Sequence, residues 1–215
     1  MINMAHKLAN SLVVLDFETT GLSPDNGDRA IEIGAVRIVD GEITEQFQAL
    51  MNPGRQVSPF IEDYTGITNV MLADARPCDE VMSEFCDFIR DDNLLAHNAS
   101  FDQKFLEHEL KLINRHYDGE FTCSLLAARR LIPESDSHSL GNLVKHLELA
   151  GEGDFHRALF DAQMTAKLWL SMLNVINDQF HISSVPFSLM QQVSCTPKKQ
   201  VASLLQDYNL QQCSF

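Results

Sequence analysis

A continuous hydrophobic run near the start of the chain ends in two acidic residues. The segment Leu12 to Leu22 reads Leu-Val-Val-Leu-Asp-Phe-Glu-Thr-Thr-Gly-Leu. A short apolar run with β-branched members is typical of a strand that is covered on both faces. Because side chains alternate along a strand, Asp16 and Glu18 are predicted to leave the same face. We therefore expect a buried strand that ends in two neighbouring carboxylates.

Two further strands are predicted directly after this one. Residues 23–29 are dense in turn-forming residues, which indicates a loop. Residues 30–39 alternate in the manner of a strand, and the dipeptide Asp40-Gly41 is a strong hairpin signal before residues 42–51. The first quarter of the chain is therefore expected to form an antiparallel meander of three strands.

Helical periodicity dominates the middle of the chain, with two short strands between the helices. Strands followed by helices in alternation predict an α/β fold with a mixed sheet. The expected segments are a helical turn at 59–64, a helix at 77–91, a strand at 93–96, a helix from Ala99, a short strand giving way to a helix within 121–131, and helices at 139–149 and 157–174.

The last part of the chain has weaker periodicity. From about residue 180 no clear pattern persists, residues 194–199 are expected to form a linker, and a last short helix is predicted near 201–208. We therefore predict one domain over residues 1–178. Residues 179–215 are expected to be a partly helical tail that is a candidate for binding a partner.

Composition is that of an ordinary soluble globular protein. The chain has 215 residues, of which 45% are hydrophobic and 21% charged. No apolar run approaches the roughly 20 residues of a membrane span, and the start has no secretory apolar region. The five cysteines are odd in number and include no Cys-x-x-Cys pair, which favours reduced thiols over a zinc site or disulfides. We expect a cytoplasmic protein without a membrane partner.

The net charge of −14 limits the kinds of nucleic-acid contact that the chain can make. General duplex binding relies on basic patches, so weak non-specific affinity for long nucleic acids is expected. A negative chain is less unusual for an enzyme whose positive charge is supplied by metal ions.

Acidic residues form a candidate metal site. Two adjacent carboxylates repel each other unless a cation lies between them, so Asp16 and Glu18 call for further oxygen ligands. Asp102 opens the helix after the short strand, Asp161 lies in the first turns of the long helix, and His156 precedes it by five residues. Taken singly, each acid has a simpler explanation, either as a solvated strand end or as compensation of a helix dipole.

Three segments together resemble the DEDDh family of exonucleases. They are Asp-Phe-Glu-Thr-Thr-Gly from Asp16, His-Asn-Ala-Ser-Phe-Asp from His97, and His-Arg-Ala-Leu-Phe-Asp-Ala from His156. Tyr-Thr-Gly-Ile-Thr from Tyr64 is similar to that family too. The family contains the proofreading epsilon subunit of bacterial DNA polymerase III and ribonuclease T. The resemblance covers about residues 12–173, and the Asp that many relatives carry near Cys123 is missing.

The resemblance implies a ribonuclease H-like fold, with a five-stranded mixed sheet and flanking helices, and a two-metal reaction. By the family pattern, Asp16 would bridge two Mg²⁺ or Mn²⁺ ions, while Glu18 and Asp161 would complete the ion on the side of the nucleophile. Asp102 would act mostly through water. Hard divalent ions select oxygen ligands, which agrees with four acids and no cysteine.

A base must also accept the proton of the attacking water. Histidine titrates nearest to neutral pH, and the position of His156 suits that role. The remaining expectations concern contacts with the terminal nucleotide. The candidate substrate-binding residues are Thr19, Thr20, Gly21, Leu22, Asn98 and Phe101. Simpler roles are open for two of them, since Phe101 suits the core and Asn98 suits a helix cap.

The sequence therefore predicts a metal-dependent 3′–5′ exonuclease that acts on single-stranded ends. DNA is favoured as the substrate, with work in replication, repair or proofreading and a polymerase as a possible partner. Three alternatives are open: an exoribonuclease, a catalytically silent polymerase scaffold, and a metal-dependent phosphatase. The ending at residues 211–215 has Gln and Phe at the spacing of peptides that dock on sliding clamps, without their central apolar residue. The oligomeric state and the sequence preference are not indicated.

Overall fold

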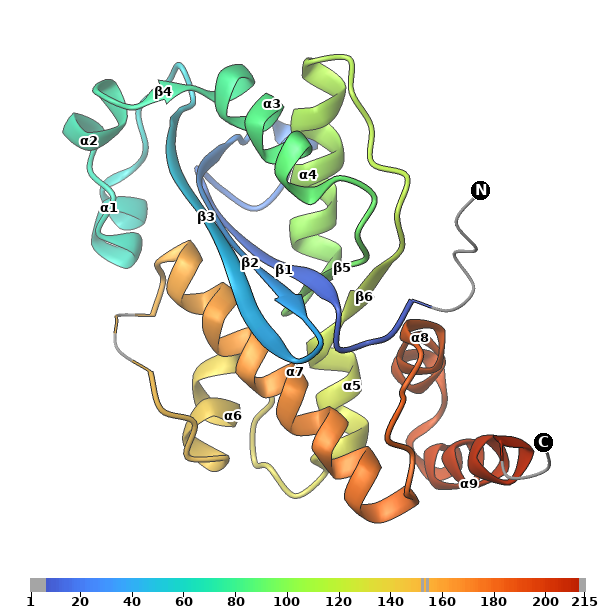
Figure 1. Ribbon diagram of the computed structural model, residues 1–215. Helices are drawn as coiled ribbons and strands as arrows, with labels where there is room; N and C mark the ends of the chain where they lie inside the picture. Colours follow the sequence, from blue (N-terminus) through green and yellow to red (C-terminus); the bar gives the residue numbers. More distant parts are fainter. Residues whose placement is uncertain (1–6, 152, 154, 213–215) are drawn as a thin grey trace.

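The computed structural model describes residues 7–151, 153 and 155–212, and it is built around one mixed β-sheet (Figure 1). The strand order is β4-β3-β2-β1-β5-β6. The pairs β1–β2 and β2–β3 are antiparallel, whereas β1–β5, β5–β6 and β3–β4 are parallel. The strands are β1 (Leu12–Thr19), β2 (Ala30–Val39), β3 (Glu42–Asn52), β4 (Arg76–Pro77), β5 (Leu94–Ala96) and β6 (Phe121–Cys123).

Helices cover both faces of this sheet, which explains the unbroken apolar run in β1. Val13 and Leu15 belong to a core shared with α3 and α4, whereas Val14 belongs to a core shared with α5 and α7. Asp16 and Glu18 have the parity of Val14, so they face α7. The helices are α1 (Pro59–Thr65), α2 (Asn69–Ala73), α3 (Cys78–Ile89), α4 (Ser100–Leu112), α5 (Ser124–Leu131), α6 (Leu140–His146), α7 (Ala158–Phe180), α8 (Phe187–Cys195) and α9 (Val201–Gln212), with 3₁₀ turns η2 (Pro24–Asn26) and η3 (Lys198–Gln200).

The predicted α/β fold with a mixed sheet is confirmed, with one strand more than expected. The additional strand is β4, two residues that pair with the end of β3. The expected strand–helix unit at 121–131 is divided into β6 and α5 at Ser124. No helix in the described part of the chain is both long and apolar enough to cross a membrane.

The segment after α7 is more ordered than its sequence pattern indicates. The helix α7 continues past residue 178 to Phe180, and α8 occupies a stretch for which no helix was predicted. Val193 of α8 and Leu205 of α9 are buried in the same core as Trp169 of α7, whose indole Nε1 donates to the Ala9 carbonyl at 2.7 Å. Residues 179–212 therefore pack on the sheet domain. Residues 213–215, and with them most of the predicted clamp peptide, lie outside the described residues.

A glycine lets α7 begin directly against the sheet. Gly34 of β2 pairs with Asp16 of β1, and a Cβ atom at Gly34 would lie only 2.0 Å from the backbone nitrogen of Leu159. No side chain fits in that space. The close approach sets the first turns of α7, which carry Asp161, over the two acids of β1.

Candidate active site

All five residues of the predicted catalytic set line one cleft of about 750 Å³. Asp16 and Glu18 come from β1, and Asp102 from the first turn of α4. Asp161 comes from the first turn of α7, and His156 from the segment just before that helix. The fold thus brings together residues that are up to 145 positions apart in the sequence. The further lining residues are Phe17, Thr19, Thr20, Gly21, Leu22, Ser58, Phe60, Ile61, Tyr64, Thr65, His97, Asn98 and Phe101.

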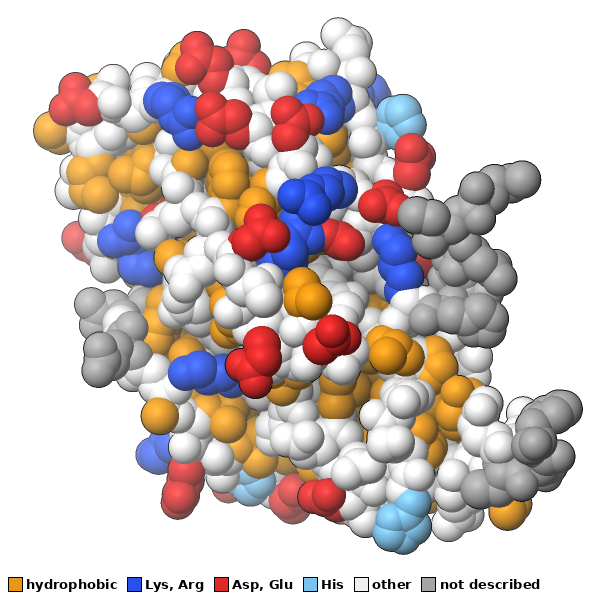
Figure 2. Space-filling model, in the orientation of Figure 1, with side chains coloured by type: hydrophobic (Ala, Val, Ile, Leu, Met, Phe, Trp, Pro, Cys, Tyr) orange, Lys and Arg blue, Asp and Glu red, His pale blue; other side chains and the backbone are white. Residues whose placement is uncertain are grey.

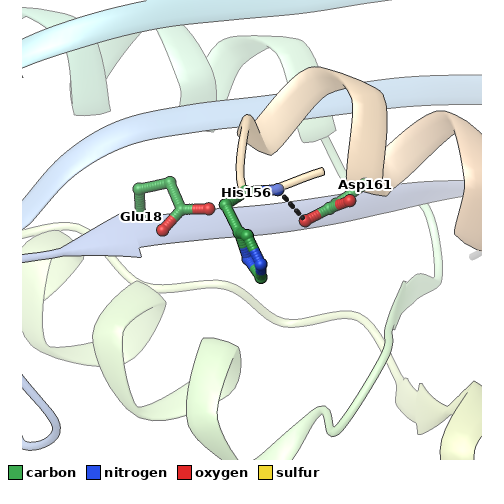
Figure 3. Close-up of side chains that lie close together, drawn as sticks. All are labelled: Glu18, His156 and Asp161. Carbon is green, nitrogen blue, oxygen red and sulfur yellow. Dashed lines mark hydrogen bonds between the residues drawn. The ribbon is translucent and has the colours of Figure 1, made fainter. Parts of the chain in front are cut away.

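Three of the five side chains form a tight group. Ligand atoms of Glu18, His156 and Asp161 all lie within 4.8 Å of one another, and Figure 3 shows the two carboxyl groups turned toward the segment that carries His156. The backbone N–H of His156 donates to Oδ2 of Asp161 at 3.1 Å. His156 has a φ of 68°, a left-handed conformation that few residues other than glycine adopt. This local strain is typical of functional positions.

Asp16 and Asp102 lie beside this group. Oδ1 of Asp102 accepts a hydrogen bond of 3.1 Å from the backbone N–H of Phe17. This bond joins the start of α4 to β1 at the residue between Asp16 and Glu18. Asp102 is buried and Asp16 is half-buried. The two extend the acidic wall of the cleft.

Burial raises the pKa of all four acids in the cleft, and repulsion by neighbouring carboxylates adds to the shift for Asp16, Glu18 and Asp161. The pKa of Glu18 is raised to about 8 by burial and then by the charges of Asp161 and Glu32. Burial raises the pKa of Asp102 to about 8 and that of Asp161 to about 6, although a backbone N–H opposes each shift. The pKa of Asp16 is raised well above its usual range by burial and by the neighbouring carboxylates. Such a cluster is electrostatically unfavourable without a counter-charge.

The donor set fits a hard divalent cation. Oδ1 of Asp161 is buried and has no hydrogen-bond partner among the described residues, which leaves an oxygen available for a ligand. Carboxylate oxygens are the ligands that Mg²⁺ prefers, and Mn²⁺ accepts an imidazole as well. The residues that could hold such an ion are Glu18, Asp161 and His156, with Asp16 and Asp102 next to them.

Comparison with known protein families identifies the family to which this chain belongs. The family model RNase_T, described as an exonuclease, matches residues 13–169. The chain belongs to this exonuclease family. A relative named DNA polymerase III PolC-type from Thermotoga petrophila is 40% identical over 167 residues, and its counterpart from Bacillus subtilis is 41% identical over 175. These matches cover 77% and 80% of this chain but only 12% of each relative.

Solved structures of other nucleases share the fold of this exonuclease domain. The structure of Exonuclease X in complex with 5′ overhanging duplex DNA has a TM-score of 0.68 and 28% identity, and the match covers 85% of this chain and 99% of that one. The nuclease domain of 3′hExo, a DEDDh family member bound to rAMP, has a TM-score of 0.66 at 22% identity, with 77% of this chain and 92% of that one covered. The expected ribonuclease H-like fold is confirmed.

The predicted substrate-binding residues form the mouth of the exonuclease cleft. The hydroxyl of Thr19 donates to the Gly21 carbonyl at 2.6 Å, and the Thr20 hydroxyl lies 3.3 Å from a carboxylate oxygen of Asp28. These bonds shape the turn after β1. The turn leaves the side chain of Leu22 84% exposed at the rim.

Asn98 and Phe101 line the other side of the mouth. Asn98 has a φ of 71° and makes no side-chain cap on α4, so the capping role is not observed. Phe101 is half-buried, and its ring packs against Phe105 at a centroid distance of 5.0 Å. It therefore contributes to the core and to the cleft together.

Two aromatic residues of α1 complete the mouth, and the sequence interpretation gave them no role. The rings of Phe60 and Tyr64 stack with centroids 5.8 Å apart, and Tyr64 lies 4.0 Å from the imidazole of His156. Phe60 is 70% exposed and Tyr64 50% exposed. Figure 2 shows hydrophobic side chains gathered over α1 and α2. Two exposed aromatics four residues apart on a helix were the signal that could have identified this surface.

Glu32 is a second residue that the sequence interpretation gave no role. It is fully buried on β2, opposite Glu18 in the register, and its two oxygens accept from Nη2 and Nε of Arg157 at 2.7 and 3.1 Å. Oε2 also accepts from the backbone N–H of Ala158 at 3.1 Å. Glu32 thus fixes the residues between His156 and α7, so we assign it a positioning role.

Replacing Glu32 with glutamine is expected to lower nuclease turnover about tenfold, the usual effect of losing a partner that orients a ligand. The loss should fall on kcat more than on KM, because substrate does not contact Glu32. Steady-state kinetics on a 5′-labelled oligonucleotide would measure it. The variant Glu45→Gln, on the neighbouring strand β3 and away from the cleft, is the control. An equal loss in both variants would contradict the positioning role.

Proposed function

We propose that this exonuclease domain is a divalent-metal-dependent 3′–5′ exonuclease that releases nucleoside 5′-monophosphates from single-stranded 3′ ends, with DNA preferred to RNA. The observation that carries the proposal is the convergence of four buried or half-buried acids and His156 in one cleft. A non-catalytic scaffold would have no use for the raised pKa values of these acids. The repulsion behind these shifts would then have no compensating role.

The ligands assigned to the metals follow the pattern of the family that the three motifs resemble. Asp16 would hold both Mg²⁺ or Mn²⁺ ions, Glu18 and Asp161 would complete one of them, and Asp102 would act through water. When bound, two such ions would make the attacking water more acidic and would stabilise the charge on the leaving oxygen. The free oxygen Oδ1 of Asp161 supports this assignment.

The residues of the chain itself contribute a base and a binding surface. His156 stands beside Glu18 and Asp161, where its imidazole can take the proton of the attacking water. Phe60 and Tyr64 offer exposed rings on which an unpaired base can stack, and Leu22 lies on the same rim. Stacking on aromatic rings is sequence-tolerant and requires an unstacked base, which supports single-stranded ends as the substrate.

The preference for DNA and a place beside a polymerase rest on the relatives. The PolC-type matches at 40% and 41% identity carry the name of a DNA polymerase, and this chain spans 12% of their length. Proofreading or end-trimming in DNA replication or repair therefore fits the domain best. Such work would place it in the cytoplasm, and contact with a polymerase or a sliding clamp is part of the proposal.

Removing the metal is expected to abolish the activity reversibly. With Mg²⁺ or Mn²⁺, a 5′-labelled DNA oligomer should shorten one nucleotide at a time, and a 3′-labelled oligomer should lose its label as a mononucleotide at once. EDTA should stop both reactions, and excess Mg²⁺ should restore them.

An RNA oligomer of the same sequence tests the sugar preference, and faster cleavage of RNA would reverse that assignment. A chromogenic phosphomonoester tests for phosphatase activity, and activity that persists in EDTA would contradict the proposal as a whole.

A further inference from the structure

A second pocket adjoins the catalytic cleft. It has a volume of about 600 Å³ and lies between the end of β5, the helix α5 and the segment that leads into α6. His97 and Asn98 line both the pocket and the cleft, so the two spaces are direct neighbours. The other lining residues are Leu125, Arg129, Asp136, Ser137, His138, Ser139 and Leu140.

Arg129 gives this pocket a positive charge that the cleft lacks. The cleft is lined by no Lys or Arg from the described part of the chain. The Arg129 side chain is exposed, and among the described residues no ion pair or hydrogen bond engages its guanidinium. An unpaired arginine is notable in a chain of net charge −14, where acids outnumber cations. Arginine presents a planar set of donors that matches phosphate oxygens.

The wall of the pocket is fixed by partly buried hydrogen bonds. The imidazole of His97 lies 2.9 Å from the Ser124 hydroxyl and 3.0 Å from the His138 carbonyl oxygen, which joins β5 to the segment before α6. The His138 ring lies 3.0 Å from the Ile132 carbonyl oxygen. These contacts hold the hydroxyls of Ser137 and Ser139 at the same mouth as Arg129. The pocket is therefore built before any ligand arrives.

We propose that this pocket binds a backbone phosphodiester of the substrate strand, upstream of the bond that is cut, through the guanidinium of Arg129. The inference rests on the proposed function, because the strand must leave the cleft to reach the pocket past His97 and Asn98. Metal ions neutralise the phosphate at the cut, and Arg129 neutralises one that lies further along the strand. Asp136, which is exposed and lines the same pocket, opposes this attraction and limits the affinity.

The test compares a substrate that reaches the pocket with one that does not. The p-nitrophenyl ester of thymidine 5′-monophosphate has a single phosphodiester, whereas a DNA 8-mer continues upstream. For Arg129→Ala we expect kcat/KM on the 8-mer to fall about tenfold, the effect of one charge-assisted hydrogen bond. Hydrolysis of the ester should stay unchanged. Arg76→Ala removes the same charge at the opposite edge of the sheet and should leave both rates unchanged.

Binding measurements test the pocket without any turnover. Fluorescence anisotropy of a labelled 8-mer in EDTA should show weaker binding for Arg129→Ala, with a salt slope smaller by about 0.7, the value for one phosphate of a single strand. Asp136→Asn should bind more tightly than the wild type. Equal losses on the 8-mer and the ester, or an unchanged salt slope, would overturn the pocket assignment. If neither substrate is cleaved, the proposed function fails, and the anisotropy still decides whether the pocket holds a phosphate.

Discussion

Replacing Glu18 with glutamine is expected to lower exonuclease turnover by about three orders of magnitude, because each lost metal ligand removes several kcal/mol of transition-state stabilisation. Glu18 has this weight because its carboxylate is one of three groups within 4.8 Å of one another. Single-turnover kinetics on a 5′-labelled oligonucleotide at saturating Mg²⁺ would measure the loss. A tenfold loss or less would remove Glu18 from the metal site.

The same variant is expected to be more stable than the wild type when metal is absent. The pKa of Glu18 lies at about 8 in the folded chain against an ordinary value of 4.5, so the folded state holds a proton that the unfolded state releases. As the pH rises from 4.5 to 8, the wild type therefore loses stability that the glutamine variant retains. At pH 8 the variant should therefore be the more stable of the two, and near pH 4 the two should coincide.

Thermal unfolding in EDTA and in Mn²⁺ would check both parts of this expectation. In EDTA at pH 8 the variant should melt several degrees higher, since each kcal/mol of stability corresponds to roughly 2–4 °C for a domain of this size. Mn²⁺ should raise the melting temperature of the wild type more than that of the variant. The control is Glu42→Gln, an exposed glutamate at the β2–β3 hairpin. A variant that melts below the wild type in EDTA would contradict the electrostatic account.

Replacing His156 with alanine is expected to lower turnover by two or more orders of magnitude while metal binding is largely retained. This is the usual contribution of a general base. The imidazole lies near Glu18 and Asp161 and against the Tyr64 ring, so under the proposed function it would stand beside the attacking water. Its backbone N–H, which holds Asp161, is unaffected by the change of side chain.

Titration with Mn²⁺ separates this role from that of a metal ligand. If His156 acts as a base, calorimetry should give similar Mn²⁺ affinities for the wild type and for His156→Ala. If it acts as a ligand, the affinity should fall together with the rate. His116→Ala is the matched control, because His116 is strongly exposed and lies away from the cleft. Unchanged turnover in His156→Ala would remove the catalytic role altogether.

The acids of the site could be predicted from the sequence because each follows a strong local pattern. The apolar run before Asp16 indicates a buried strand. Asp102 and Asp161 each lie near the start of a segment with clear helical periodicity. The three motifs, in their order along the chain, resemble the exonuclease family, and that resemblance predicted that the acids meet in one site. The structure adds the physical reason, since Gly34 leaves room for α7 to begin beside Asp16.

Contacts that depend on distant pairing could not be predicted in this way. Glu32 and Arg157 are separated by 125 positions, and on β2 a glutamate within an alternating strand suggests only a solvated side. The predicted helix ends at Asn174, whereas α7 continues to Phe180, and beyond Asn174 its buried residues include only Ile176. The helix α8 has nine residues, and its buried side includes Ser194, so its apolar stripe is short and interrupted.

The single tryptophan gives this chain a natural optical reporter. Trp169 is a fully buried residue of α7, its indole is hydrogen-bonded to the Ala9 carbonyl, and it packs in a core to which α8 and α9 contribute. Its emission should therefore shift when the C-terminal helices detach, whereas nucleotides bound in the distant cleft should leave it unquenched. One spectroscopic signal can thus follow whether the last two helices unfold with the rest of the protein or before it.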